Sequence, residues 1–203
     1  MISLLCAARE KFGKIYAFEL QESFASLAAR NIELNGLSDM ITVKGLDIRE
    51  VTARDTDGEL DCVMMNPPYM RDGSGRESRA DEMRTARREL NGTIYDFCSA
   101  ASRLLRYGGT LSVVHRPDRM VDVFDAMRKS GIEPKNLVTV YPDTESEPSL
   151  VLIDGRRGGA PSLTVHRPLI IYKSGTREYT DDMQQIYDGF TFEHITDRRQ
   201  REK

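Results

Sequence analysis

Three stretches of the chain place a polar side chain directly after a run of apolar residues. Glu19 stands at the end of KIYAFEL (14–20), Asp47 follows a second run in KGLDI (44–48), and Asn66 comes directly after DCVMM (61–65). A carboxylate at the end of a strand in a doubly wound sheet can accept hydrogen bonds from ribose hydroxyls. Taken alone, Glu19 is equally well explained as a solvated strand end, and Asp47 as a turn residue beside Gly45.

The tetrapeptide Asn66-Pro67-Pro68-Tyr69 has a more definite chemistry. Two prolines fix the backbone, so nearby carbonyl groups point in set directions at little entropic cost. The Asn66 side-chain oxygen and the Pro67 carbonyl can both accept hydrogen bonds from one NH2 group. Such a pair turns the nitrogen lone pair toward an electrophile and stabilises the positive charge that grows during alkylation, while Tyr69 offers a ring for stacking. The alternative is a rigid turn that only ends a strand.

Apolar runs and amphipathic stretches alternate along the chain, which predicts an α/β fold with a mainly parallel sheet covered by helices on both faces. Ligands in such folds bind at the carboxyl ends of the strands. Glycines at 36, 108–109 and 131 are expected to end helices. We expect strands at 14–20, 40–43, 61–65, 110–114, 137–141 and 149–154, the last two as an antiparallel pair, extended chain at 163–172, and helices at 1–9, 21–35, 93–107, 118–130 and 180–188.

The composition is that of an ordinary soluble chain of roughly one domain: 203 residues, 39% apolar, 30% charged, net charge −3. It excludes collagen-like, disordered and disulfide-framework classes, and the slightly acidic balance argues against a non-specific nucleic-acid binder. No apolar run approaches the roughly 18–20 residues that span a bilayer, and the start does not read as a signal peptide. Cys6, Cys62 and Cys98 have no metal spacing, and the histidines form no ligand pattern. We therefore expect buried free thiols, a cytoplasmic protein, no membrane and no metal.

Glu19, Asp47 and the NPPY tetrapeptide, in this order on successive strands, resemble the class I S-adenosylmethionine-dependent methyltransferases that modify amino groups. More narrowly, the chain is similar to the bacterial tRNA1(Val) (adenine-37)-N6-methyltransferase group. NPPY is shared across amine methyltransferases, so later segments carry the closer match, although Arg88 stands where a histidine is expected. The matching segments span most of residues 15–190: NPPYMRDGSG (66–75), ARRE (86–89), GGTLSVVHRPDRM (108–120), LVLIDGRRGG (150–159) and RPLIIY (167–172).

This resemblance implies a Rossmann-like methyltransferase sheet, S-adenosylmethionine as cofactor, and an anticodon-loop adenine of tRNA as substrate. The adenine must leave its stack to reach the pocket. By the same resemblance, Glu19 and Leu20 lie at the cofactor ribose, and Asp47 and Ile48 border its adenine. Asn66, Pro67, Pro68 and Tyr69 hold the target amine and are the candidate catalytic residues, with Asn66 also beside the cofactor.

Residues 71–88 carry six arginines and four acids and read as an exposed, mobile loop that runs into a helix start. Arg71, Arg87 and Arg88 are candidate contacts to RNA phosphates, which would make binding sensitive to salt. A solvated, charge-balanced loop explains the same residues. His115 and Arg116 follow another strand and are either RNA contacts or part of a polar turn before a helix. We assign residues 1–190 to one methyltransferase domain and 191–203 to a charged tail.

The glycine-rich cofactor loop of this family lies between its first strand and first helix, and its glycines let the backbone approach the ligand. This chain has no glycine before Gly13, and residues 1–9 resemble the helix that follows that loop. We therefore interpret residues 1–203 as an N-terminally truncated domain without the first strand and the loop. Two strand edges then lose their hydrogen-bond partners, at roughly 1–3 kcal/mol for each buried group, and the chain is expected to bind S-adenosylmethionine poorly.

Two other functions fit the same residues. An NPPY pocket also suits the side-chain amide of glutamine, as in protein-glutamine N5-methyltransferases of the release-factor type. The third alternative is a non-catalytic RNA-binding or scaffold fragment left by loss of the cofactor loop, which would retain RNA without transferring a methyl group. The arginine-rich stretch and the C-terminal segments favour RNA over protein as the substrate.

Overall fold

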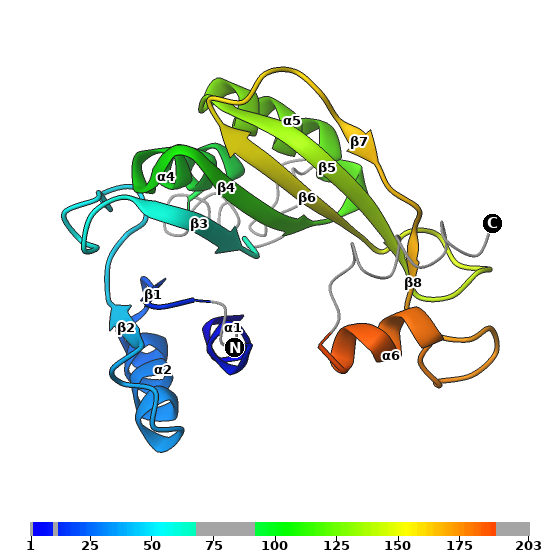
Figure 1. The fold of residues 1–203 in the computed structure, drawn as a ribbon, viewed down its shortest axis with the longest axis horizontal. Helices are drawn as coiled ribbons and strands as arrows, with labels where there is room; N and C mark the ends of the chain where they lie inside the picture. Colours follow the sequence, from blue (N-terminus) through cyan, green and yellow to red (C-terminus); the bar gives the residue numbers. More distant parts are fainter. Residues whose placement is uncertain (1, 10–11, 68–91, 190–203) are drawn as a thin grey trace, which may run out of the picture.

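The computed structural model describes residues 2–9, 12–67 and 92–189. Their strands form two separate sheets (Figure 1). One is a parallel pair, and the other has six strands in the order β3-β4-β6-β5-β7, with β8 also paired to β5. The elements are α1 (Ile2–Ala8), β1 (Ile15–Phe18), α2 (Glu22–Leu34), β2 (Ile41–Lys44), β3 (Leu60–Met65), α4 (Ile94–Leu104), β4 (Leu105–His115), the 3-10 turn η1 (Pro117–Arg119), α5 (Met120–Lys129), β5 (Ile132–Tyr141), β6 (Leu150–Arg157), β7 (Thr164–Val165), β8 (Leu169–Ile170) and α6 (Asp181–Tyr187).

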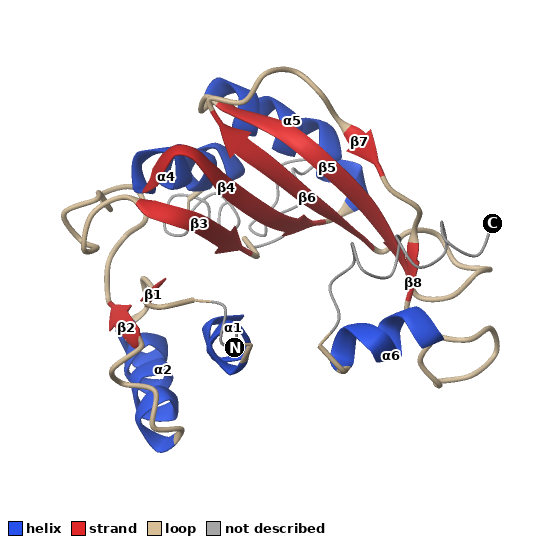
Figure 2. Cartoon of the chain, viewed as in Figure 1, coloured by secondary structure: helices blue, strands red, loops and turns tan. Residues whose placement is uncertain are grey.

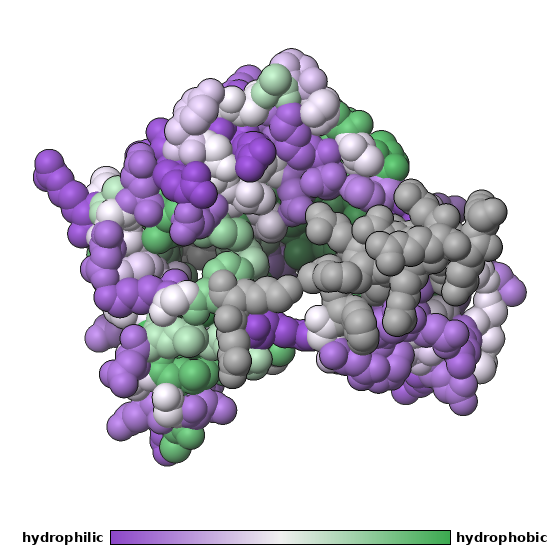
Figure 3. Space-filling view, in the orientation of Figure 1, coloured by the Kyte–Doolittle hydropathy of each residue, from purple (hydrophilic) through white to green (hydrophobic). Residues whose placement is uncertain are grey.

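The small region consists of α1, β1, α2 and β2, within residues 2–9 and 12–44. Its core contains three buried side chains, Ala7, Ile32 and Ile41, one from each of α1, α2 and β2. The apolar face predicted for α2 is only partly covered, because Phe24 and Leu27 keep 52% and 54% of their surface exposed. Apolar side chains accordingly gather on the surface where β1, β2 and α2 lie (Figure 3).

The large region consists of residues 60–67 and 92–189 and holds most of the core. Helices α4 and α5 cover one face of the six-stranded sheet, while α1 and α6 lie on the other side (Figure 2). Buried residues alternate along β4, as expected for a strand with one face on the core. Leu111 and Val113 of β4 and Val151 and Ile153 of β6 are 0–2% exposed and pack against the two helices.

The structure corrects three predictions about these elements. The sheet is mixed rather than mainly parallel, since β6 runs antiparallel to both β4 and β5. The predicted helix 93–107 ends at Leu104, because Leu105 adopts extended backbone, is fully buried and pairs with Leu60 of β3. Strand β5 begins at Ile132 rather than at 137, with a register shift between Pro134 and Asn136 that accommodates the proline in the ladder.

Strands β1 and β3 face each other without pairing. Among the described residues no strand lies between them, and a cavity of about 770 Å³ occupies the space. Their starts are held near each other, because Asp57, shortly before β3, forms an ion pair with Lys14 and donates its backbone N–H to the Tyr16 hydroxyl (3.1 Å). The Cys6 thiol of α1 also lies 3.5 Å from the sulfur of Met64 in β3.

The expectation of three buried free thiols is confirmed only in part, and two predicted segments lie outside the described residues. Cys98 is buried, whereas Cys6 and Cys62 are only partly so, and all three are free thiols. The arginine-rich stretch 71–88 and the whole tail 191–203 fall outside the described residues. Within residues 2–9, 12–67 and 92–189, no helix is long and apolar enough to cross a membrane.

Candidate active site

The cavity between the two regions collects five of the predicted site residues. Its lining includes Glu19, Leu20, Asp47, Ile48 and Asn66. These residues follow β1, β2 and β3, so the carboxyl ends of three strands meet at one opening, as ligand sites in α/β folds do. The volume of about 770 Å³ is within the range of about 300–1,000 Å³ that small-molecule and cofactor sites occupy.

Glu19 is fixed by the backbone on both sides of it. Its own N–H donates to the carbonyl of Lys44 (3.1 Å), which extends the pairing of β1 with β2 by one residue. Its carboxylate Oε1 accepts the N–H of Gln21 (2.9 Å), the residue just before α2 begins at Glu22. The side chain is therefore fixed beside the start of α2 while it lines the cavity, and a carboxylate is able to accept hydrogen bonds from hydroxyl groups there.

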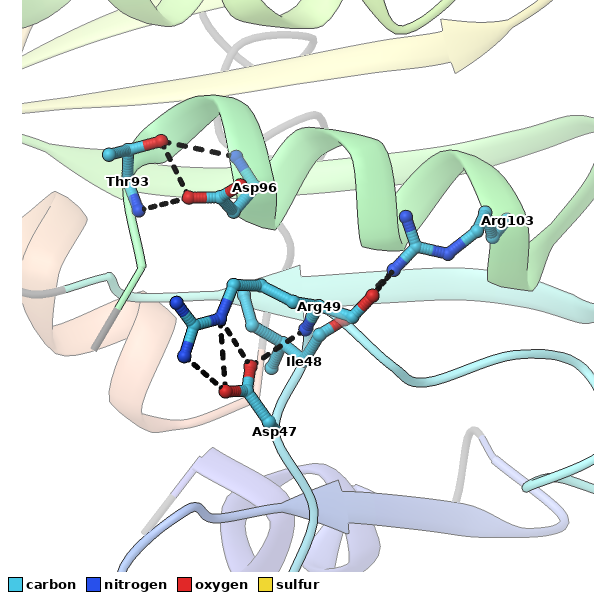
Figure 4. Close-up of polar contacts among 6 residues, drawn as sticks. All are labelled: Asp47, Ile48, Arg49, Thr93, Asp96 and Arg103. Carbon is cyan, nitrogen blue, oxygen red and sulfur yellow. Dashed lines mark hydrogen bonds and ion pairs between the residues drawn. The ribbon is translucent and has the colours of Figure 1, made fainter. Parts of the chain in front are cut away.

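Asp47 sits in a turn that its own carboxylate organises (Figure 4). Oδ1 accepts the backbone N–H of Arg49 (2.9 Å), and the Arg49 Nε lies 3.0 Å and 2.9 Å from the two carboxylate oxygens. The guanidinium bonds lower the pKa of Asp47 below its ordinary value, so the carboxylate is ionised at neutral pH. An ionised carboxylate is an acceptor only, which suits the exocyclic amine of a purine.

The start of α4 lies against this turn. Thr93 and Asp96 form a reciprocal cap: the Thr93 N–H and hydroxyl donate to Asp96 Oδ2 (2.7 and 2.8 Å), and the Asp96 N–H donates to the Thr93 hydroxyl (3.4 Å). Gly92, with φ +78°, precedes the cap, and a β-carbon there would lie 3.8 Å from the Cδ1 of Ile48. The left-handed backbone at Gly92 thus lets the chain enter the helix beside the Ile48 side chain.

Asn66 and Pro67 stand where β3 leaves the sheet. Strand β3 is held by β4 up to its last residue, Met65, which is opposite Val113. Pro67 is buried and Asn66 is exposed on the cavity rim, so the turn is anchored by the proline and presents the amide. Pro68 and Tyr69 lie outside the described residues, and their roles stay predictions.

The structure does not bring His115 and Arg116 into the cavity lining. His115, at the end of β4, is 5% exposed, and its Nδ1 accepts the backbone N–H of Arg116 (2.8 Å). Burial lowers the pKa of His115, which keeps the ring neutral near pH 7. Arg116 forms an ion pair with Asp118 (3.0 Å), and this contact fits the polar turn that was the alternative to RNA binding. Arg71, Arg87 and Arg88 lie outside the described residues.

Sequence reasoning missed two kinds of residue at this site. The pair Thr93 and Asp96 has the spacing of a helix cap just before an apolar run, so the pattern could have identified it. Arg49 and Arg103, which hold the turn after Asp47, have no such signal, because their partners are a carboxylate and backbone carbonyls brought near by the fold.

The chemistry of the lining fits the adenosine part of a cofactor. Two carboxylates, Glu19 and Asp47, stand beside apolar side chains such as Ile48 and Phe97, a combination that suits hydroxyls, an amine and a flat base. No glycine is among the described residues of the lining. None of those residues therefore corresponds to the glycine-rich cofactor loop that the resemblance implies. No group of three or more His, Cys, Asp or Glu side chains suited to a metal occurs among the residues that the structure describes.

No protein-family model matches the chain. It is 22% identical to a tRNA1(Val) (adenine(37)-N6)-methyltransferase of Shewanella sediminis (strain HAW-EB3), over 94% of this chain and 80% of that protein. Among solved structures it is similar to a predicted O-methyltransferase from Agrobacterium tumefaciens, with a TM-score of 0.67 and 22% identity over 87% of this chain and 77% of that one.

A second solved structure is geranyl diphosphate C-methyltransferase from Streptomyces coelicolor A3(2), in complex with Mg²⁺, geranyl diphosphate and S-adenosyl-L-homocysteine. It has a TM-score of 0.54 and 14% identity over 75% of this chain and 67% of that one. The fold is therefore the Rossmann-like fold of class I methyltransferases, as the family resemblance implies. The curated relative is named as a methyltransferase that acts on tRNA.

Proposed function

We propose that the protein transfers a methyl group from S-adenosylmethionine to the exocyclic N6 amine of an adenine in tRNA. The observation that carries this proposal is the meeting of Glu19, Asp47, Ile48 and Asn66 at one cavity. Strand ends that are distant in sequence converge there in the order that the family resemblance implies. The fold likeness to methyltransferases and the curated tRNA-modifying relative support it.

The residues present assign two sides to the site. Glu19 accepts hydrogen bonds from the cofactor ribose, and Asp47 and Ile48 border its adenine. The cofactor, when bound, supplies an electrophilic methyl group on a positively charged sulfur. The side opposite the two carboxylates belongs to Asn66, at the end of β3.

Asn66 and Pro67 align the target amine. The Asn66 side-chain oxygen and the Pro67 carbonyl each accept one hydrogen of the N6 amino group, which orients the nitrogen lone pair outward from both acceptors. As the bond from nitrogen to the methyl carbon forms and the bond from that carbon to sulfur breaks, the positive charge passes to the nitrogen, where the two oxygens stabilise it. The amine is already neutral, so no strong base is needed before attack, and the proton leaves afterwards. The contribution of the protein is alignment and electrostatics.

The test measures methyl transfer from labelled S-adenosylmethionine, at saturating concentration, to unmodified tRNA and to a release factor. We expect label in tRNA as N6-methyladenine, and an Asn66→Ala variant slower by about 10²–10³-fold, as when one hydrogen-bonding group that stabilises transition-state charge is removed. Asn31→Ala, at an exposed position in α2, is the matched control and should leave the rate unchanged.

Three outcomes would contradict the proposal. An Asn66→Ala variant as fast as the wild type would exclude the proposed role of the asparagine. Label in the release factor instead of tRNA would indicate glutamine N5 methylation. Retention of tRNA without any transfer at high cofactor concentration would indicate the non-catalytic RNA-binding alternative.

A further inference from the structure

Arg103, on α4, binds the backbone of the turn that follows Asp47. Its Nη2 donates to the carbonyls of Ile48 (2.9 Å) and Arg49 (3.0 Å), and its Nε donates to the carbonyl of Val51 (3.1 Å). Figure 4 shows the guanidinium directed from α4 at this turn. One side chain therefore holds three carbonyls that are nearly consecutive in sequence.

The bound turn is part of the cavity wall, whereas Arg103 is not. Asp47 and Ile48 line the cavity, and Arg103 is absent from its lining. The turn has no strand partner to fix it, since residues 45–52 lie outside the two sheets and make local backbone hydrogen bonds, such as that from the Glu50 N–H to the Asp47 carbonyl (3.0 Å). A contact from another element therefore sets where this piece of wall stands relative to the large region.

Helix α4 is a rigid support for such a contact. Cys98 and Ala101 are 0–1% exposed in the main core, and Ala100 and Leu104 of the same helix line the cavity. Arg103 is oriented along this helix by a bond from its Nη1 to the Ser99 hydroxyl (3.0 Å). The guanidinium thus fixes the position of Ile48 relative to a helix that itself lines the cavity.

We infer that Arg103 is a positioning residue of the proposed cofactor site, which sets the adenine-facing turn of Asp47 and Ile48 against α4. The inference rests on the proposed function for the identity of the ligand. The three carbonyls are bonded by two separate nitrogens of the planar guanidinium, so a lysine in the same place keeps the charge but has all its donors on one nitrogen and does not reproduce this arrangement. The loss should therefore appear in cofactor affinity rather than in the chemical step, because Arg103 does not reach the reacting groups.

The test compares Arg103→Met and Arg103→Lys with wild type, and uses Arg106→Met as a matched control. Arg106 is also exposed, three positions further along the chain, and pairs with the exposed carboxylate of Asp61 (2.5 Å) away from the turn. One readout is hydrogen–deuterium exchange across residues 45–52. The others are the affinity for S-adenosylhomocysteine and the split between KM for S-adenosylmethionine and kcat.

We expect Arg103→Met to speed exchange across the turn and to weaken S-adenosylhomocysteine binding by about tenfold, which corresponds to about 1.4 kcal/mol. KM for the cofactor should rise with kcat nearly unchanged, Arg103→Lys should restore little, and Arg106→Met should match wild type. Unchanged exchange, or faster exchange with unchanged affinity, would overturn the inference. Because the chain is expected to bind the cofactor poorly, the affinity is measured up to high S-adenosylhomocysteine concentration. A wild type that binds none even there would overturn the proposed function and with it the assigned ligand, while the exchange data alone report whether Arg103 holds the turn.

Discussion

The two regions of the molecule differ in how much of their apolar surface they bury. In the large region, thirteen buried side chains form one cluster under α4 and α5. In the small region, three buried side chains form the core, and Phe24, Leu27 and Leu34 of α2 are more than half exposed. Since hydrophobic stabilisation scales with buried apolar area, the large region should carry most of the stability.

This difference has a consequence for the candidate site. Asn66 and α4 belong to the well-packed region, while Glu19 and Leu20 belong to the poorly packed one. We therefore expect the wall that contains Asn66 to be the more rigid one, and the wall that contains Glu19 to adjust more readily to a ligand. Local stability differences of this kind are typical of ligand sites, where the elements that move come from the less stable part.

The strongest test of the difference in burial between the two regions is a pair of matched alanine substitutions, one in each core. Leu111→Ala removes a fully buried side chain of β4 and should cost about 2–5 kcal/mol, as large-to-small changes in a core do. Ile41→Ala removes a side chain that is 3% exposed in the small region. We expect the first to lower the midpoint of global denaturation and the second to speed hydrogen exchange mainly within residues 2–44. Equal losses of the global midpoint would show instead that the two regions unfold as one unit.

The reactivity of the three cysteines provides a second test of the difference between the two regions. Burial raises the pKa of Cys98 to about 12 and that of Cys62 to about 11, and it raises the pKa of Cys6 on α1 as well. The thiolate is the reactive form, so the difference of one pKa unit makes the alkylation of Cys62 about tenfold faster than that of Cys98 when both are equally accessible. We expect Cys6 to be alkylated first, then Cys62, then Cys98. Alkylation of the native protein, monitored by mass spectrometry, measures this order. Cys98 reacting as fast as Cys6 would mean that the large region opens as readily as the small one.

The smallest expected effect concerns the turn between the regions. The pKa of Asp47 is lowered by Arg49, so this interaction stabilises the folded protein above the ordinary carboxyl pKa of 3.8 and is lost as the pH falls through the lowered value. Arg49→Ala should raise the Asp47 pKa toward 3.8 and flatten this part of the acid dependence. An NMR titration of the Asp47 carboxyl checks the shift. A carboxyl that titrates identically in both proteins would show that the ion pair does not persist in solution.

Much of this fold follows from local patterns in the sequence. The strand ends at Glu19, Asp47 and Asn66 were found because short apolar runs precede them, and their convergence follows from the α/β alternation. The end of α4 was missed because Leu105 continues the helical spacing, while pairing with Leu60 decides its backbone. Arg103 was missed for the same reason: its partners are backbone carbonyls 52–55 positions away, and no side-chain pattern marks a carbonyl.

The chain passes from the small region to the large one once, through residues 45–59. The two regions are thus joined by this single covalent tether and by a few side-chain contacts, such as that of Arg9 in the small region with the carbonyl of Ile186 (2.8 Å). A ligand that touches both walls of the cavity acts as a further non-covalent crosslink between them. Its binding removes the freedom of the tether, which is an entropic cost that every ligand of this site must overcome. Arg103 lowers this entropic cost, because its hydrogen bonds to the carbonyls of Ile48 and Arg49 already hold part of the tether against α4 before a ligand binds.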